Sequence, residues 1–403
     1  MKNARNRTQP KPLTPVIIKI MKVAFLLSQI NVVTTGFIKE QIRIANSFAD
    51  VEIISLNDDV QEFEGMVVHS IPFKQALPNS VSNVLLWPVR RIGLMNYYRD
   101  LRFGRELKAV LESINADVLH VQFGQHADVL FTHIPDFSCP TIVQFRGRDA
   151  SSRVIARPAY RRHLAEILNR PNVFTASVCD ALIHHLKEQG VPVKYHSVLH
   201  TPIDTEFFSP MRPVSPAHGT KRLVQIGSFR EKKGQLQLLK LFEAYSKEHP
   251  DAWQLHLYGE GETKEKCQEF VKSRNLTNQV LFHSWIDRNQ VKEVLNEADA
   301  FVHLAITPPN GDMEGIPNAI AEAMSMELPV ISTDHSGIPE LITSRDEGRI
   351  IEIDFVAFKD TLNELRERNK MPKARTRVCD AFSIEQHKSA LQALYRQALD
   401  RHA

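Results

Sequence analysis

Short apolar runs rich in β-branched residues alternate with segments of helical period along most of the chain. Segments 36–48 (GFIKEQIRIANSF) and 103–114 (FGRELKAVLESI) have the helical pattern. Strands that are apolar on both faces and joined by helices predict a parallel, doubly wound sheet. The predicted strands of the first half are KVAFLL (22–27), VEIIS (51–55), MVVH (66–69), DVLHV (117–121), TIVQF (141–145), NVFTA (172–176) and KYHSVL (194–199).

The same alternation of strand and helix patterns begins again after SPMRPVSPAHGT (209–220), whose prolines, serines and glycine indicate a linker. The later strands are RLVQI (222–226), WQLHLYG (253–259), QVLFHS (279–284), AFVHL (300–304), PVIST (329–333) and RIIEI (349–353). We therefore expect two doubly wound Rossmann-like α/β domains in tandem, facing a central cleft. Their expected bounds are a basic, disordered tail at 1–20, a first domain at 21–208, the linker, a second domain at 221–380, and a last helix at 381–403 that packs across either domain.

Length and composition agree with this picture. A chain of 403 residues exceeds the size at which one hydrophobic core stops growing, about 250–300 residues. The net charge of +3 is too small to indicate nucleic acid. Four scattered cysteines fit a reducing cytosol better than a disulfide framework or a zinc site. Because no apolar run is long enough to span a membrane, we expect a cytoplasmic protein.

One region departs from this near balance of basic and acidic residues. Segment 85–108 carries six Lys or Arg residues against two acids, interleaved with aromatic side chains, and further arginines follow between 146 and 162. Such a surface favours peripheral contact with an anionic membrane on its inner face, although an ordinary amphipathic surface helix has the same pattern.

Segment 310–341 holds the most informative chemistry. It sets two carboxylates, Glu314 and Glu322, on either side of a helix start, where free N–H groups and the helix dipole favour a diphosphate. We expect Pro317 in the first helical turn, where its missing N–H costs nothing. A carboxylate is a good acceptor for vicinal hydroxyls, so Glu314 fits a sugar and Glu322 a ribose. The phosphate-binding turn would be Gly315, Ile316, Pro317 and Asn318.

Other candidates follow predicted strands. In the second domain, segment 225–239 (QIGSFREKKGQLQLL) offers a turn at Gly227 and Ser228 and the cations Arg230, Lys232 and Lys233 to the same phosphates. Gly259 lines the nucleotide cleft.

In the first domain, Gly36 lies in a loop before a helix and permits close approach to a ligand. Arg146 and Asp149 follow a strand; Asp149 is a polar contact or base, or alternatively a helix N-cap. His120 is more often a core residue than a functional one. The sequence has no D-x-D or H-E-x-x-H motif, so we expect no metal and no cofactor.

These motifs resemble the retaining GT-B glycosyltransferases called glycosyl transferases group 1, over about residues 22–375. Segment 311–342 is the most specific match, and TTGFIKEQI (34–42), HVQFG (120–124) and FRGRDAS (145–151) resemble the branch that builds bacterial exopolysaccharide and lipopolysaccharide, including colanic acid transferases. The resemblance implies that the second domain binds a nucleotide-sugar donor and the first binds the acceptor. It also implies that Glu314 holds the donor sugar, Glu322 the ribose and Lys233 the diphosphate.

Two positions depart from the family pattern. Ser228 stands where the family has an arginine after the glycine, so Arg230 would have to replace it. Arg146 stands where a histidine commonly touches the donor.

The function we expect is metal-independent sugar transfer, with retention, from a nucleoside diphosphate sugar to a hydroxyl of a glycan or lipid-linked glycan in cell-surface polysaccharide biosynthesis. Its expected catalytic residues are Glu314, Lys233, Arg230 and Asp149. A nucleotide-sugar epimerase and a non-catalytic sugar-nucleotide-binding subunit of an assembly complex stay open as alternatives.

Overall fold

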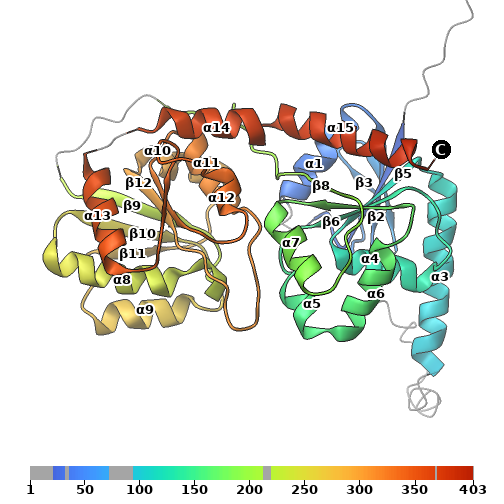
Figure 1. Ribbon diagram of the computed structural model, residues 1–403, viewed down its shortest axis with the longest axis horizontal. Coiled ribbons are helices and arrows are strands. Elements are labelled where there is room, and N and C mark those ends of the chain that lie inside the picture. Colours follow the sequence, from blue (N-terminus) through green and yellow to red (C-terminus); the bar gives the residue numbers. More distant parts are fainter. Residues whose placement is uncertain (1–20, 32–35, 72–93, 212–218, 368–369, 403) are drawn as a thin grey trace, which may run out of the picture.

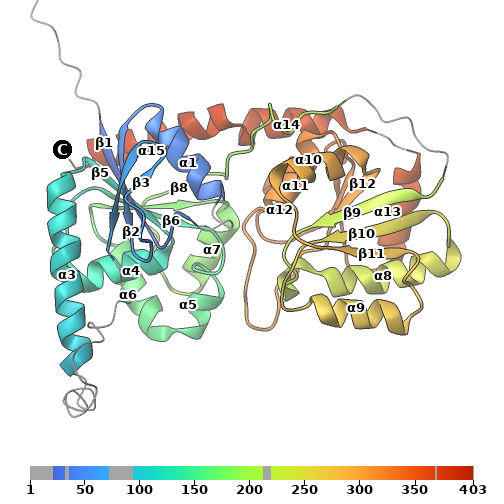
Figure 2. The same cartoon turned by 180° about the vertical axis from the view of Figure 1, so that it is seen from behind.

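The computed structural model describes residues 21–31, 36–71, 94–211, 219–367 and 370–402, without the side chains of 94–100. The predicted tail at 1–20, most of the predicted linker and residues 85–93 of the basic aromatic segment lie outside the described residues. The rest forms two sheets, each with helices on both faces (Figures 1 and 2).

The first sheet has eight strands in the order β3-β4-β2-β1-β5-β6-β7-β8. All neighbouring pairs are parallel except β3 and β4, so the expectation of a purely parallel sheet is wrong at this edge. The strands are β1 (Lys22–Leu27), β2 (Asp50–Ser55), β3 (Glu62–Phe63), β4 (Met66–Ser70), β5 (Val118–Gln122), β6 (Thr141–Phe145), β7 (Val173–Ser177) and β8 (His196–Val198). The helices are α1 (Gly36–Asn46), α3 (Leu94–Ile114), α4 (Gly124–His133), α5 (Ser152–Ala156), α6 (Pro158–Leu168) and α7 (Asp180–Glu188).

The second sheet has six parallel strands in the order β11-β10-β9-β12-β13-β14. They are β9 (Lys221–Ile226), β10 (Trp253–Tyr258), β11 (Val280–His283), β12 (Ala300–His303), β13 (Val330–Thr333) and β14 (Arg349–Ile351). The accompanying helices are the 3₁₀ helix η2 (Glu231–Lys233), α8 (Gln235–Glu248), α9 (Lys264–Ser273), α10 (Arg288–Glu297), α11 (Asn318–Ser325), α12 (Ile338–Leu341) and α13 (Phe355–Arg366).

Alternating side chains of the strands build a core on each face of both sheets. In β1, Phe25 packs in one core while Leu26 packs in the other, and in β9 Leu223 and Val224 divide in the same way. Because both faces are covered, the central strands read as continuous apolar runs. The carboxyl ends of the strands are left for loops, and these loops carry the candidate site.

Two consecutive C-terminal helices connect the halves. Helix α14 (Pro372–Phe382) packs on the second sheet's core, and α15 (Ile384–Asp400) packs on the first through residues such as Leu391 and Tyr395 (Figure 1). Ser383 caps α15 between them. The last helix therefore crosses back to the first sheet. None of the helices in the described part of the chain combines the length and apolar character needed to cross a bilayer.

Candidate functional site

Helix α11 begins one residue later than the sequence suggested. Pro317 is its N-cap, with φ −65° and ψ 119°, and Asn318 is the first helical residue. The prediction that Pro317 lies within the first turn is therefore wrong by one position, because its extended ψ keeps it outside the helix. Within the described residues, Gly315 and Ile316 donate their N–H groups to no other residue. These donors and the helix dipole leave the α11 N-terminus available to an anion.

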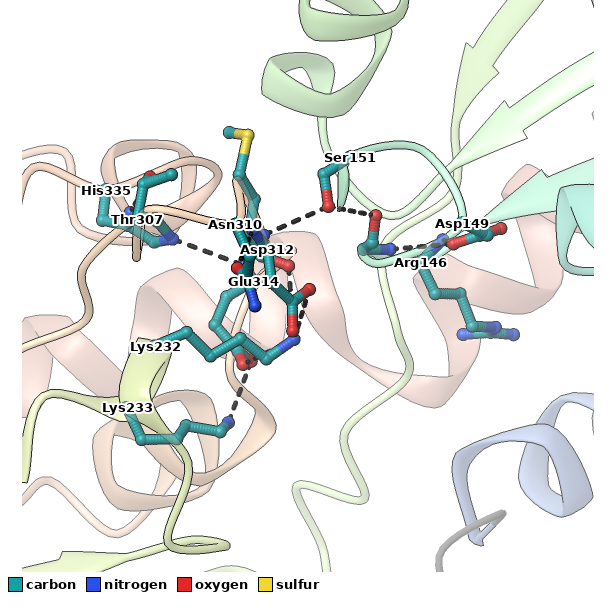
Figure 3. Close-up of polar contacts among 12 residues, drawn as sticks. Arg146, Asp149, Ser151, Lys232, Lys233, Thr307, Asn310, Asp312, Glu314 and His335 are labelled. Atoms are coloured by element: carbon teal, nitrogen blue, oxygen red, sulfur yellow. Dashed lines mark hydrogen bonds and ion pairs between the residues drawn. The ribbon is translucent and has the colours of Figure 1, made fainter. Parts of the chain in front are cut away.

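Two lysines hold Glu314 in front of this helix end (Figure 3). Lys233 Nζ lies 2.9 Å from Glu314 Oε2, and Lys232 Nζ lies 3.3 Å from Glu314 Oε1. Lys232 also pairs with Asp312 at 3.1 Å. The side chains of Lys232, Lys233 and Glu314 are only 13%, 16% and 11% exposed, respectively. The structure thus brings the candidate residues Glu314, Lys232 and Lys233 together in one cluster.

The lysines are fixed by the backbone on which they stand. Ile306 N–H donates to the Lys232 carbonyl at 3.0 Å, and Gln225 Nε2 donates to the Lys233 carbonyl at 2.8 Å. Gly234 then turns the chain into α8 with φ +68°, and a Cβ built on it would lie 1.7 Å from the carbonyl oxygen of Leu304. The two cations are therefore positioned by close contact with the loop that follows β12.

Charge at this cluster is set by the lysines. Burial alone would raise the pKa of Glu314, but the Lys233 and Lys232 ammonium groups outweigh it and lower this pKa to about 2. His335 accepts the N–H of Glu314 at Nε2, 3.3 Å away, and burial lowers the pKa of its imidazole. Glu314 is consequently an anion, and His335 is neutral, at physiological pH.

Glu322 has the opposite environment. It stands in the second turn of α11, half-buried, and its carboxylate makes no hydrogen bond or ion pair with any residue in the described ranges. Burial raises its pKa to about 7, and the charge of Arg288 offsets only part of this. An unpaired, partly desolvated carboxylate is costly unless a ligand supplies donors. The structure therefore leaves Glu322 available, as a ribose-binding residue would be.

Segments that follow strands of the first sheet contact the segment that carries Glu314. We call these contacts the domain junction; they join residues 146–151 and 178–181 to residues 313–316 and 336–340. Met313 N–H donates to Ser151 Oγ at 3.1 Å (Figure 3). A Cβ on Gly315 would lie 2.4 Å from Val178 Cγ2. Glu340 accepts the N–H groups of Asp180 and Ala181 at 3.1 and 3.2 Å. The carboxyl ends of the two sheets therefore face each other across the lysine cluster.

Asp149 lies beside the junction but is turned into the protein. It is 3% exposed, and its carboxylate accepts the backbone N–H groups of Gly124, Arg146 and Gly147 at 3.0, 3.2 and 3.2 Å. Because Asp149 is buried and both of its oxygens accept backbone N–H groups, the geometry contradicts both earlier interpretations. Asp149 does not face a substrate as a base, and it is not the N-cap of the following helix, since the N-cap of α5 is Ser151. Its bond to Gly124 instead satisfies the first N–H group of α4.

His120 is buried between Gln144 and Tyr395, as a core histidine would be.

The other predicted residues of the second domain, and Gly36, contribute no side chain to the cluster of Lys232, Lys233 and Glu314 in the part of the chain that the structure describes. Ser228 and Arg230 are exposed, and the structure records no side-chain contact between Arg230 and Glu314. Gly227 has open space around its Cβ position, whereas a Cβ on Gly259 would lie 2.1 Å from the Gly227 carbonyl oxygen. Gly259 therefore serves the packing of two loops. Gly36 is the first residue of α1 instead of a loop residue, with open space around it.

The sequence analysis missed His335 and Ser151. His335 follows the carboxyl end of β13 and Ser151 follows that of β6, so strand order could have flagged both. Their contacts with Glu314 and Met313 depend on how the loops fold and could not be seen. Within the described ranges, no group of three or more His, Cys, Asp or Glu side chains is arranged to hold a metal ion.

Comparisons with known proteins agree with this geometry. The sequence model of the family described as Glycosyl transferases group 1 matches residues 210–377, which contain the lysines and both glutamates. The putative colanic acid biosynthesis glycosyltransferase WcaL of Escherichia coli K12 is 30% identical over 51% of this chain, and that match spans half of WcaL's length. The amylovoran biosynthesis glycosyltransferase AmsK of Erwinia amylovora is 25% identical over 81% of this chain and 86% of AmsK.

Solved structures share the fold over nearly the whole chain. A glycosyltransferase from Rickettsia africae superposes with a TM-score of 0.71 at 15% identity, covering 94% of this chain and 99% of that one. Anabaena Alr3699/HepE in complex with UDP has a TM-score of 0.69 at 14% identity, covering 94% and 100%. Residues 210–377 thus match the glycosyl transferases group 1 family, and the chain has the GT-B fold.

Proposed function

We propose that the protein is a retaining glycosyltransferase of cell-surface polysaccharide biosynthesis. It takes a sugar from a nucleoside diphosphate sugar and attaches it to a hydroxyl of a glycan or lipid-linked glycan. The observation that carries this proposal is the cluster of Lys232, Lys233 and Glu314 at the open N-terminus of α11, with the unpaired Glu322 one turn along the helix. The names of WcaL and AmsK support the polysaccharide pathway.

In this proposal the donor lies along the helix start. The diphosphate accepts hydrogen bonds from the N–H groups near Gly315, and the two lysines neutralise its negative charge. The Glu322 carboxylate accepts hydrogen bonds from the ribose hydroxyls, and the Glu314 carboxylate accepts hydrogen bonds from hydroxyls of the sugar. The presence of UDP in the Anabaena Alr3699/HepE structure supports uracil as the base.

The lysines would stabilise the departing diphosphate. The bond between the anomeric carbon and the phosphate oxygen breaks, and the acceptor oxygen forms its bond on the same face of the sugar. The acceptor's proton passes to the departing phosphate oxygen, so no protein nucleophile is required. Glu314 now pairs with both lysines, and these cations shift their contacts toward phosphate oxygens as charge develops there. A closed domain junction would exclude water and so favour transfer over hydrolysis.

The acceptor side of this proposal rests on the first sheet. Arg148, Arg157 and Arg162 are exposed around α5 and α6 and form no ion pair with other described residues. We propose that this surface contacts an anionic membrane face, where a lipid-linked acceptor would be found.

A donor panel tests the proposal. The full chain is incubated with single nucleoside diphosphate sugars and lipid-linked glycans presented in vesicles, with and without anionic lipid. Mass spectrometry should show one added sugar, NMR should show the anomeric configuration of the donor, and anionic lipid should raise the rate. Conversion of the donor sugar without an acceptor would identify an epimerase instead, and donor binding without any turnover would indicate a binding subunit.

Glu322 gives the donor site a pH dependence. Its pKa of about 7 means that the free protein carries this carboxyl partly protonated at neutral pH, whereas binding to ribose hydroxyls requires the ionised form. UDP binding should therefore release part of a proton near pH 7, and affinity should rise as pH increases through this value. Calorimetry in buffers of different ionisation enthalpy measures the release. Glu322→Gln corrects for protons released by the phosphate; an identical release by this variant would refute the assignment.

A further inference from the structure

The guanidinium of Arg146, a residue of the domain junction, forms no ion pair with any residue that the structure describes. Its Nε and Nη2 donate to Gln122 Oε1 at 3.2 and 3.0 Å, and Nη2 also donates to Gln41 Oε1 at 2.5 Å. Its plane lies over the Phe37 ring, 4.6 Å from the centroid. Nη1 has no hydrogen-bond partner among the residues that the structure describes, and it is not sealed from solvent. The edge of the guanidinium formed by Nε and Nη2 is therefore held in place, while Nη1 stays open to a ligand.

The side chains around this cation are neutral. Gln122 contacts Gln144, which bonds to His120, and burial lowers the pKa of His120 to about 3. The nearest acid along the chain, Asp149, uses its oxygens on backbone N–H groups instead of the Arg146 side chain. Burial lowers the pKa of Arg146 to about 9, and the charge of Asp149 offsets only part of this. A half-buried arginine held by amide oxygens alone has a charge that an anion from outside would neutralise.

The backbone of Arg146 lies next to the segment that carries the candidate sugar site. A Cβ on Gly315 would lie 3.1 Å from the Arg146 carbonyl oxygen, and one on Gly147 would lie 3.0 Å from the Met313 carbonyl oxygen. The backbone of Arg146 therefore abuts the segment that carries Glu314. In Figure 3 its side chain points away from Glu314. The guanidinium reaches α1, where Nη2 donates to Gln41 Oε1. A sugar held by Glu314 at one edge would present its opposite edge to Arg146.

We propose that Arg146 binds a carboxylate on the transferred sugar, so that the donor is a nucleoside diphosphate hexuronic acid. The inference rests on the proposed function and names its substrate class. A carboxylate accepts from Nη1 and neutralises the guanidinium, whereas the hydroxymethyl group of a neutral hexose would leave the charge unpaired. Arg146 is thus a specificity-determining residue. Gln41 and Gln122 position it by holding the opposite edge of its fork.

Donor binding tests this without an acceptor. Calorimetry compares pairs that differ only at C6: UDP-glucuronic acid with UDP-glucose, UDP-galacturonic acid with UDP-galactose, and GDP-mannuronic acid with GDP-mannose. We expect one of the three pairs to contain the donor of this protein. In that pair the nucleoside diphosphate hexuronic acid should bind about 10- to 100-fold more tightly than the neutral nucleotide sugar, as expected for a hydrogen bond between charged groups. In Arg146→Gln this difference should fall to within about 2-fold. Arg366→Gln removes an exposed arginine in the last turn of α13, away from the proposed site and membrane surface, and should keep the full difference.

A second variant tests the same contact in case Arg146→Gln does not fold. Gln122→Glu keeps Arg146 but supplies an internal carboxylate, so it should also abolish the preference for the acid. If the wild-type protein binds both members of every pair equally, or if the preference persists in Arg146→Gln and Gln122→Glu, the inference is wrong and the proposed function stands. If the wild-type protein binds none of these nucleotide sugars and no UDP or GDP, the proposed function fails as well.

Discussion

Replacing Glu314 by alanine should lower sugar transfer by at least about 100-fold while the protein stays folded. Among the described residues, Glu314 is the one carboxylate that pairs with both lysines, and its removal takes away the proposed acceptor for the sugar's hydroxyls. Lys232 keeps Asp312 as a partner, so the cost to folding is limited. Initial rates with the preferred donor, together with thermal unfolding, measure the two effects separately.

Two comparisons sharpen this result. Glu314→Gln keeps the shape of the side chain and removes its charge, so it should be nearly as inactive as the alanine variant. Asp312→Asn alters only the outer partner of Lys232 and should cost much less. The thermal midpoint of Glu314→Ala should drop by no more than about 5 °C. Near-normal turnover by either Glu314 variant would show that this carboxylate does not hold the sugar.

Gly234→Ala should destabilise the second α/β unit severely, by about 3 kcal/mol or more. The residue has φ +68°, and a Cβ would lie 1.7 Å from the Leu304 carbonyl oxygen, a backbone atom that cannot move without displacing the loop after β12. Since Lys232 and Lys233 directly precede this turn, any protein that still folds should also bind donor poorly. Urea unfolding gives the free energy of unfolding, and UDP calorimetry gives the binding loss.

Gly227→Ala is the matched control for stability. Gly227 is in the same loop, but no atom lies within 4 Å of its Cβ position and its φ is not in the left-handed region. This variant should unfold within about 1 kcal/mol of the wild-type protein. Equal stability of Gly234→Ala and Gly227→Ala would contradict the packing argument.

The order of elements was accessible from the sequence because apolar strands buried on both faces leave an unmistakable pattern. KVAFLL and TIVQF became β1 and β6 within one residue of their expected bounds. The antiparallel β3 was missed because two residues carry no period. The side on which α15 packs could not be read either, since its apolar stripe, which includes Leu391 and Tyr395, would suit either sheet.

The site was only partly predictable. Glu314 and Lys233 were found because each follows a strand and carries charge beside a helix start. That they pair with each other, 81 positions apart, depends on the approach of two loops. Asp149 was misread because a carboxylate after a strand looks the same in sequence whether it faces a ligand or binds three backbone N–H groups. The open edge of Arg146 likewise emerged only from its surroundings.

The most direct test of the account is a crystal structure with the preferred nucleotide sugar bound. We expect the diphosphate within hydrogen-bonding distance of the N–H groups between Gly315 and Asn318 and of the two lysines. The ribose should lie on Glu322 and the sugar against Glu314. A nucleotide bound away from the α11 N-terminus, or one bound there with Glu314 and Glu322 both turned to solvent, would contradict the central claim.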